Sequence, residues 1–301
     1  MSIHQMNISG LDKVETAIKR IQTFEPPEGY YLAFSGGKDS VVCKALCDMA
    51  GVKYDAHYNI TTVDPPELVQ FVKTFPDVIR DRQYWKSDGI CHKKGDPITM
   101  WNLIIHKATP PTRVARYCCQ YLKETGGEGR LTITGVRWDE SSNRKRNQGE
   151  LVIVNAPKEA IDSPDFYQTP RGGVVLVNDN EESRKMVESC YKRRRTVVNP
   201  IIDWTTDEVW EFIHEYNLPY CKLYDEGHER LGCIGCPMGT VKGRIEEFEK
   251  YPKIKKAYMR AFSKMIETRK LRNMPKVNAH DADGNPVDWE TEEAVMKWWL
   301  Q

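Results

Sequence analysis

One short polar segment carries six residues that together could bind an anion: Ser35, Gly36, Gly37, Lys38, Asp39 and Ser40. An apolar run precedes this segment and a helix-periodic run follows it, so we expect a strand, a glycine turn and a helix. Such a turn aims backbone N–H groups and the positive end of the helix dipole at one point, which suits a phosphate. The glycines let the backbone approach the anion, the serines add hydroxyl donors, and Lys38 balances the charge. Asp39 is a candidate to hold a magnesium ion or to orient a nucleophile.

Four cysteines form a second candidate site. Cys118 and Cys119 are adjacent, whereas Cys233 and Cys236 are separated by two residues. A Cys-x-x-Cys turn lets two thiolates reach one metal centre. Adjacent cysteines diverge, so they rarely share one zinc, but they can reach two irons of a cubane, and four thiolates are the normal complement of a [4Fe–4S] cluster. We therefore predict such a cluster, with Lys123 offsetting its charge; zinc and unligated or redox-active thiols are the alternatives.

The elements that position these residues alternate along the chain. We expect strands over residues 30–34, 53–60 and 131–134, and helices over residues 10–23, 39–50, 97–108 and 205–216. This alternation predicts an α/β fold, with a parallel sheet covered on both faces by helices. Ligands of such sheets bind beyond the carboxyl ends of the strands.

Further polar residues follow two of the predicted strands. Thr62 and Asp64 come after the second strand, and Gly135 and Arg137 come after the third. We expect them to meet the 35–40 segment at one sheet edge, with Asp64 as a second candidate for magnesium. Arg137 and Arg144 could then give bidentate contacts to an anionic group.

The domain organisation follows from the same pattern. We predict a nucleotide-binding domain over residues 1–240, with a polar insertion over 140–195 and short strands near 151–155 and 174–177. Residues 241–301 would form a mainly helical extension, with one or two charged helices over 243–272 and a short terminal helix. A lid, a dimer element and a docking site all suit this extension.

The composition limits the class of protein. The 301 residues are 40% hydrophobic and 29% charged, as in ordinary soluble proteins, and the net charge of +1 predicts no general attraction to nucleic acid or membrane. No apolar run approaches the about 20 residues of a membrane span, and the first residues lack signal-peptide character, so we expect a cytoplasmic protein with no membrane partner. Nine cysteines in a reducing compartment indicate metal or redox chemistry rather than disulfides.

The ordered motifs resemble a known family. Residues 35–40 resemble the pyrophosphate loop of the adenine-nucleotide α-hydrolase-like enzymes and lack the spacing of a Walker loop. Residues 135–141 resemble the Gly-x-Arg-x-x-Glu-Ser loop of the phosphoadenosine phosphosulfate (PAPS) reductases. Arg113, with the adjacent cysteines and Lys123, resembles the cluster-binding segment of the adenylylsulfate (APS) reductases, and residues 223–227 and 232–237 complete the series.

The resemblance implies an enzyme that binds an adenine nucleotide, either ATP or APS/PAPS, but it leaves the reaction open. The reductases attack sulfur with a cysteine in a Glu-Cys-Gly-Leu-His tail, and residues 237–301 contain no cysteine, which leaves Cys91 or Cys221 as substitutes. The chain is also similar to the sulfurtransferase of DNA phosphorothioation systems, which implies adenylylation with pyrophosphate release before sulfur displaces AMP. We favour this second chemistry; reduction of APS or PAPS and a non-catalytic nucleotide-binding role are the alternatives. A thioredoxin-like reductant or sulfur donor, a nucleic-acid substrate and a homo-oligomer stay open as partners.

Overall fold

A computed structural model describes residues 2–6, 10–275, 279–280, 284, 286–287 and 289–301. The chain forms two compact units. The first, here the sheet unit, contains Met1–Tyr58, Glu67–Arg80 and Gly126–Leu231. The second, here the helical unit, contains Asn59–Pro66, Asp81–Thr125 and Gly232–Gln301. The predicted division at residue 240 stays a prediction, as does the status of residues 140–195 as an insertion.

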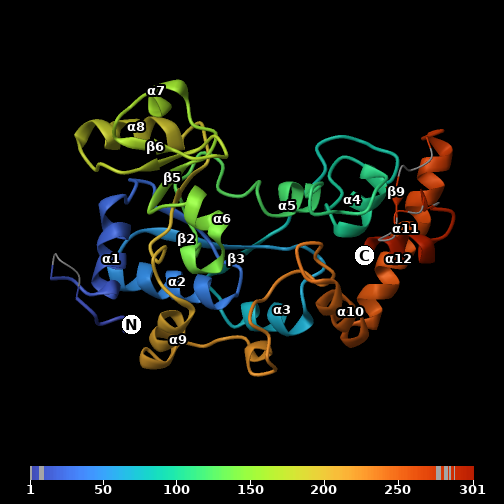
Figure 1. The fold of residues 1–301 in the computed structure, drawn as a ribbon, viewed down its shortest axis with the longest axis horizontal. Coiled ribbons are helices and arrows are strands. Elements are labelled where there is room, and N and C mark those ends of the chain that lie inside the picture. Colours follow the sequence, from blue (N-terminus) through green and yellow to red (C-terminus); the bar gives the residue numbers. More distant parts are fainter. Residues whose placement is uncertain (1, 7–9, 276–278, 281–283, 285, 288) are drawn as a thin grey trace. The chain divides into compact units, whose positions relative to one another are not determined.

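An eight-stranded sheet organises the sheet unit, with the strand order β3-β2-β1-β4-β8-β5-β7-β6 (Figure 1). The strands are β1 (Tyr30–Ala33), β2 (Tyr54–Asn59), β3 (Val78–Asp81), β4 (Thr132–Ile133), β5 (Leu151–Ile153), β6 (Phe166–Gln168), β7 (Val174–Leu176) and β8 (Thr196–Val198). β1 runs parallel to β2 and to β4, and β4 runs parallel to β8. This arrangement confirms the predicted α/β fold with a parallel sheet. β5, β7 and β6 then extend the sheet with antiparallel pairs.

The helices of the sheet unit are α1 (Lys13–Thr23), α2 (Lys38–Ala50), α3 (Pro66–Lys73), α6 (Ser142–Asn147), α7 (Lys158–Ile161), α8 (Glu181–Tyr191) and α9 (Thr206–Glu215). Two short 3₁₀ helices, η1 (Trp138–Glu140) and η2 (Lys222–Tyr224), accompany them. Thr205 caps α9 and exchanges hydrogen bonds with Glu208, as the sequence pattern indicates. Gly51 ends α2 in the left-handed conformation, with φ of +67°. α2 packs against both α1 and α9.

The segment 140–195 is more regular than the sequence predicts. The expected strands near 151–155 and 174–177 are present as β5 and β7, but β6 and the helices α6, α7 and α8 were not predicted. β5, β6 and β7 have three residues each, too few for an alternating pattern to stand out.

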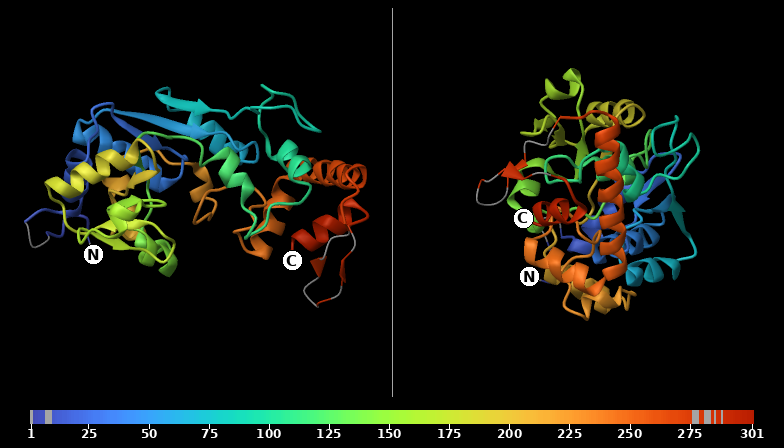
Figure 2. Two further views of the ribbon diagram at one scale, coloured as in Figure 1. Left: turned by 90° about the horizontal axis from the view of Figure 1, so that it is seen from above. Right: turned by 90° about the vertical axis from the view of Figure 1, so that its right-hand side faces the viewer.

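The helical unit contains α4 (Met100–Lys107), α5 (Tyr117–Leu122), α10 (Val241–Lys250), α11 (Pro252–Leu271) and α12 (Glu292–Trp299). A small antiparallel pair, β9 (Ala279–His280) and β10 (Pro286–Val287), completes it. Charged residues over 243–272 thus form two helices, and Pro252 starts the second, where its missing N–H costs nothing. α11 packs along α4 and α12, and α11 and α12 lie side by side in both views of Figure 2.

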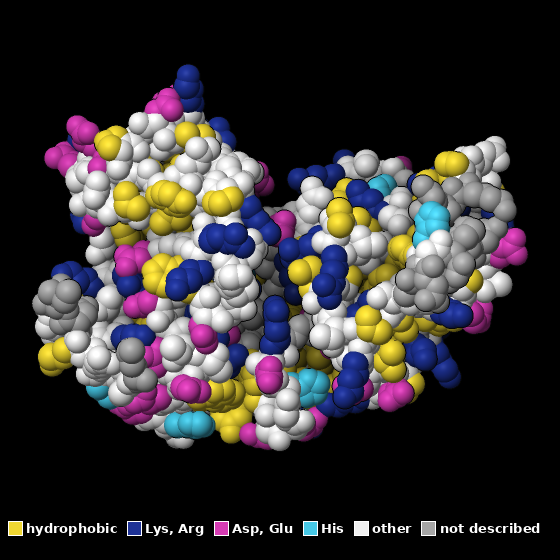
Figure 3. All heavy atoms as spheres, in the orientation of Figure 1, with side chains coloured by type: hydrophobic (Ala, Val, Ile, Leu, Met, Phe, Trp, Pro, Cys, Tyr) yellow, Lys and Arg dark blue, Asp and Glu magenta, His cyan; other side chains and the backbone are white. Residues whose placement is uncertain are grey.

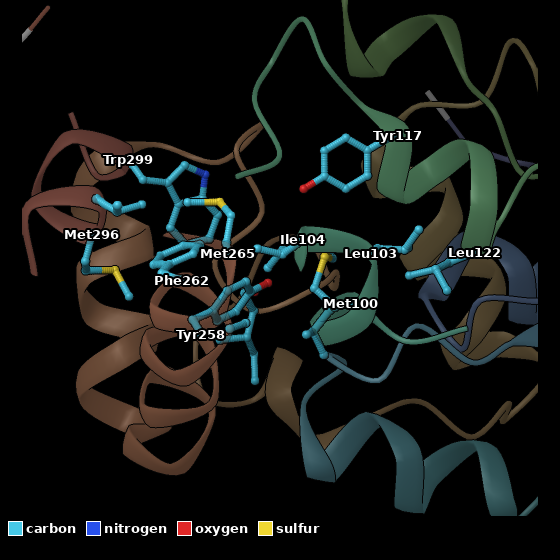
Figure 4. Packing of buried hydrophobic residues seen from close by; sticks show 14 of the residues in the cluster. Met100, Leu103, Ile104, Tyr117, Leu122, Tyr258, Phe262, Met265, Met296 and Trp299 are labelled. Carbon is cyan, nitrogen blue, oxygen red and sulfur yellow. The ribbon is translucent and has the colours of Figure 1, made fainter. Parts of the chain in front are cut away.

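Aromatic, aliphatic and methionine side chains together fill the core of the helical unit (Figure 4). The ring of Trp299 lies 4.9 Å from that of Tyr258 and 5.4 Å from that of Phe262, and all three residues are buried. α12 is therefore anchored by the hydrophobic effect and by ring contacts, of which that between Trp299 and Phe262 is edge-to-face.

Charged side chains of both signs are interspersed on the face of the molecule seen in Figure 3, in line with the net charge of +1. Among the described helices, none combines the length and the apolar character that crossing a membrane requires.

Candidate functional site

A cavity of about 870 Å³ opens at the carboxyl ends of β1 and β4. Its lining comes from five segments of the sheet unit: Ala33, Ser35 and Gly37–Ser40; Thr134–Arg137; Glu140 and Arg144; Thr206 and Trp210; Tyr224 and Gly227–Leu231. This volume lies within the range of ligand pockets, about 300–1,000 Å³. The position agrees with the rule for open α/β sheets.

The N-terminus of α2 forms one wall of this cavity. Gly37 is the N-cap residue, and its N–H donates to Ser35 Oγ at 3.3 Å. The N–H of Lys38 donates to the hydroxyl of Tyr224 at 2.9 Å. The Nζ of Lys38 is buried and donates to the carbonyl of Glu229 at 3.2 Å. A buried lysine and a helix N-terminus together favour an anion at this point.

Two glycines allow the close approach of neighbouring segments here. Gly36 has φ of +75°, and a Cβ added to it would lie 2.8 Å from the side chains of Leu68 and Val72 on α3. Its bare face therefore packs against α3, and Gly36 is absent from the described cavity lining. A Cβ on Gly135 would lie 2.9 Å from the carbonyl oxygen of Asp39, so this glycine lets the segment after β4 approach α2.

Where the segment after β4 approaches α2, Arg137 bonds to Asp39. Its Nε donates to Asp39 Oδ1 at 2.6 Å, and its Nη1 donates to the carbonyl of Trp204 at 3.2 Å and to Asp139 Oδ2 at 3.3 Å. The guanidinium is buried. The bidentate contact to a ligand that the sequence predicts for Arg137 thus competes with bonds to the protein itself, and the arginine primarily fixes the Asp39 carboxylate.

Arg144, in α6, also lines the cavity and pairs with Glu140, the last residue of η1. Burial lowers the pKa of Arg144, the charge of Arg230 lowers it further, and Glu140 opposes both effects. Two guanidinium groups therefore face one cavity wall, which suits an anionic ligand.

Sequence reasoning missed several residues of this cavity. Trp210 is half-buried and lies on the cavity wall, with its ring 5.1 Å from that of Tyr224. Trp204, on the preceding segment, is buried. Tyr224 belongs to the motif at 223–227, which could have indicated a role at the ligand; nothing local in the sequence indicates Arg230.

The four predicted cysteine ligands all belong to the helical unit. Cys118 and Cys119 lie in α5, and Cys233 and Cys236 flank a tight turn in which the N–H of Cys236 donates to the carbonyl of Cys233 at 3.2 Å. Burial raises the pKa of Tyr258, and the nearby thiols of Cys233, Cys118 and Cys236 raise it further. The structure thus brings both pairs around one buried tyrosine.

The two kinds of metal centre predicted for these thiols require different geometries. All nine cysteines are free thiols. Among the residues that the structure describes, no three His, Cys, Asp or Glu side chains converge as ligands of a single ion do. One tetrahedral zinc needs its four sulfurs at about 2.3 Å from one point. A cubane instead holds each thiolate on a different iron, so its ligands lie farther apart.

Positive side chains surround the cysteines. Arg116 donates to Cys119 Sγ at 3.3 Å. The pKa of Cys119 is lowered by the hydrogen bond from Cys118 and by the charges of Arg116 and Lys123. Lys123 lies beside Cys233 and Asp64, whose negative charges raise its pKa.

Thr62 and Asp64, predicted as nucleotide contacts, belong to this helical unit. The Sγ of Cys233 lies 3.8 Å from Asp64 Oδ1. Thr62 Oγ1 accepts the N–H of Met100 at the start of α4, at 3.0 Å. In this unit the two residues therefore support the cysteine turn and a helix end.

The other cysteines lack the features of an activated nucleophile. Cys43, Cys47, Cys190 and Cys221 are buried. Burial raises the pKa of Cys221 and of Cys91, and the thiol of Cys91 donates to the carbonyl of Asn102 at 3.4 Å. A raised pKa leaves little thiolate at neutral pH.

Comparison with known proteins places the chain in a family. Residues 29–239 match the phosphoadenosine phosphosulfate reductase domain, so the chain belongs to this family. An uncharacterised protein of Methanocaldococcus jannaschii is 24% identical over 222 residues, which cover 74% of this chain and 44% of that protein. An adenosine 5'-phosphosulfate reductase of Oceanobacillus iheyensis is 54% identical over 39 residues, 13% of this chain and 16% of that protein. The chain thus spans less than half the length of these curated relatives.

Among solved structures, a phosphoadenylyl-sulfate reductase from Candida auris in a phosphate complex is 14% identical, with a TM-score of 0.40. The match covers 77% of this chain and 98% of that one.

Proposed function

We propose that the sheet unit binds ATP and transfers its adenylyl group to an acceptor, with release of pyrophosphate. The main support for the proposal is the cavity at the N-terminus of α2, which buried Lys38 and the first residues of that helix line together. The β- and γ-phosphates would lie there, since this point combines a positive side chain with the helix dipole. Arg144 and Arg230 supply positive charge along the same wall.

The proposed reaction consists of two successive displacements. An acceptor oxygen attacks the α-phosphorus of ATP, and the bond to the β-phosphate oxygen breaks, so that pyrophosphate leaves with its charge near Lys38. A sulfur nucleophile then attacks the activated acceptor carbon or phosphorus, and AMP leaves. Asp39, fixed by Arg137, would present Oδ2 to a magnesium ion that enters with the nucleotide.

The helical unit would hold a [4Fe–4S] cluster through Cys118, Cys119, Cys233 and Cys236. Three observations support the fit: the thiols are free, both pairs lie near Tyr258, and Arg116 and Lys123 supply positive charge. When bound, the cluster would supply redox chemistry or carry the sulfur that is transferred. The donor of that sulfur, or a thioredoxin-like reductant, is a partner that this function requires.

Membership in the family supports a second function, reduction of APS or PAPS to sulfite. That reaction needs a cysteine that attacks sulfur. The raised pKa of Cys91 and of Cys221 argues against either as this nucleophile. Adenylyl transfer, which needs no such thiol, therefore agrees better with the described residues.

Parallel product analysis on anaerobically purified protein tests the two functions. Pyrophosphate release from ATP, reduced at least about 100-fold in D39A and in K38A, is the expected result; removal of one preorganised charge costs this much in comparable sites. Sulfite release from PAPS with thioredoxin, without pyrophosphate from ATP, would contradict the proposal. R184A serves as the control, because Arg184 pairs with Asp179 on the surface and lies outside the described cavity lining.

A further inference from the structure

The helix α10 lies outside the residues that match the family, yet it contacts the second cysteine pair. The N–H of Gly235 donates to Glu247 Oε2 at 2.7 Å. Gly235 has φ of +70°, and a Cβ added to it would lie 2.4 Å from the ring of Phe248. On the next helix, the hydroxyl of Tyr258 donates to the carbonyl of Ile234 at 3.1 Å. The C-terminal helices therefore fix the backbone of the turn that carries Cys233 and Cys236.

Arg244, on the first turns of α10, contacts the same turn. Its Cγ lies 3.6 Å from the position of a Cβ on Gly239, whose own N–H donates to the carbonyl of Cys236 at 2.9 Å. The guanidinium stacks on the ring of Trp299, 4.3 Å from its centre, and Nη1 donates to the Trp299 carbonyl at 2.7 Å. These contacts hold the side chain in one orientation.

The guanidinium of Arg244 is buried, and its hydrogen-bonding capacity is only partly used. The residue is only 5% exposed, and neither Nε nor Nη2 finds a hydrogen-bond acceptor among the described residues. Burial lowers the pKa of Arg244, and the charge of Cys236 opposes this effect. A buried guanidinium with two unbonded nitrogens is costly unless an anion lies beside it. The groups close enough to raise the pKa of Arg244 by their charge are Tyr258, Cys236 and Glu247, and of these only Cys236 belongs to the cysteine turn.

We propose that Arg244 is a positioning residue for the iron–sulfur cluster, with its free N–H groups directed at the Cys236 thiolate and its charge raising the reduction potential of the cluster. This inference rests on the proposed [4Fe–4S] site. Reduction adds a negative charge to an assembly that four thiolates already make anionic, and hydrogen bonds and nearby charge set its potential. A guanidinium stays protonated at any working pH, so its effect on the reduction potential does not depend on pH. The C-terminal helices thereby have a function: they bring a fixed cation to the cluster.

A redox titration of the full-length chain tests the proposal. The cluster is reconstituted anaerobically, its iron and sulfide are counted, and its midpoint potential is followed by electron paramagnetic resonance. In R244M, the ratio of reduced to oxidised cluster at a fixed potential should fall about tenfold, equivalent to about 59 mV for one electron. R244K keeps the charge, so its ratio of reduced to oxidised cluster should stay within about twofold of the wild-type ratio. R244Q has a polar side chain but no charge, so its ratio of reduced to oxidised cluster should fall as much as that of R244M. R244Q also replaces R244M in the test if R244M does not fold.

R269M is the matched control. Arg269 also belongs to the helical unit and lies over a tryptophan ring, that of Trp289 at 5.6 Å, but it bonds to the carbonyls of Ala108 and Pro275 rather than to the cysteine turn. The potential of R269M should equal that of the wild type. An unchanged potential in R244M and R244Q at full iron content, or an equal shift in R269M, would overturn the role of Arg244 alone. A wild-type chain that binds no iron would overturn the cluster as well.

Discussion

Replacement of Arg137 by methionine should destabilise the sheet unit more than any other single change at the cavity. Methionine keeps much of the volume but removes the bonds to Asp39, Asp139 and the Trp204 carbonyl. Loss of one partner from a buried ion pair costs about 3–5 kcal/mol. The Asp39 and Asp139 side chains are 23% and 43% exposed, so water can solvate both carboxylates in part when the arginine is removed. We therefore expect the lower end of that range, about 3 kcal/mol.

Calorimetry or circular dichroism can measure this loss as a change in melting temperature. For a unit of about 150–250 residues, 1 kcal/mol lowers Tm by about 2–4 °C, so R137M should melt about 6–12 °C below the wild type. The melting temperature of R137K should lie between those of R137M and the wild type, because an ammonium keeps the charge but cannot bond to Asp39 and the Trp204 carbonyl at the same time.

R144M provides the comparison, since the Arg144 side chain is 31% exposed and paired with Glu140. A partly exposed pair contributes at most about 1 kcal/mol, so R144M should melt within about 4 °C of the wild type. An R137M protein that melts within about 2 °C of the wild type would refute the reasoning. So would an R144M protein that loses as much stability as R137M.

Three further changes test the remaining features. K38A should weaken ATP binding in isothermal titration calorimetry about 10–100-fold, the worth of one charge-assisted contact, and unchanged affinity would place the phosphates elsewhere. G235A should destabilise the helical unit by about 1–3 kcal/mol in urea unfolding, because its Cβ meets Phe248 at a positive φ; a neutral effect would mean that the turn relaxes freely. Burial lowers the pKa of His106, as do the charges of His92, Lys107 and Arg272, so the folded state binds this proton less readily than the unfolded state. Stability should therefore decrease as pH falls below about 6.5, and H106N should remove part of that slope in urea titrations at pH 5–8.

Local sequence determined the elements around the cavity. The glycine turn at residues 35–37, the apolar run before it and the cap at Thr205 act within a few residues of chain, so β1, α2 and α9 begin and end close to the predicted positions. The spacing of Cys233 and Cys236 also defined their turn in advance. These features depend on backbone preferences and on short-range hydrogen bonds, which the order of residues specifies directly.

The partner of each side chain was decided only by the tertiary structure. Arg137 turned out to bind Asp39, 98 positions away, because the bare Cα of Gly135 lets two segments touch. Asp64 follows a strand end, as predicted, yet its carboxylate lies beside Cys233. Arg244 resembles any other arginine of a charged helix until Trp299 and the cysteine turn enclose it. Burial and contact between distant segments depend on how whole elements pack, and no local pattern in the sequence encodes them.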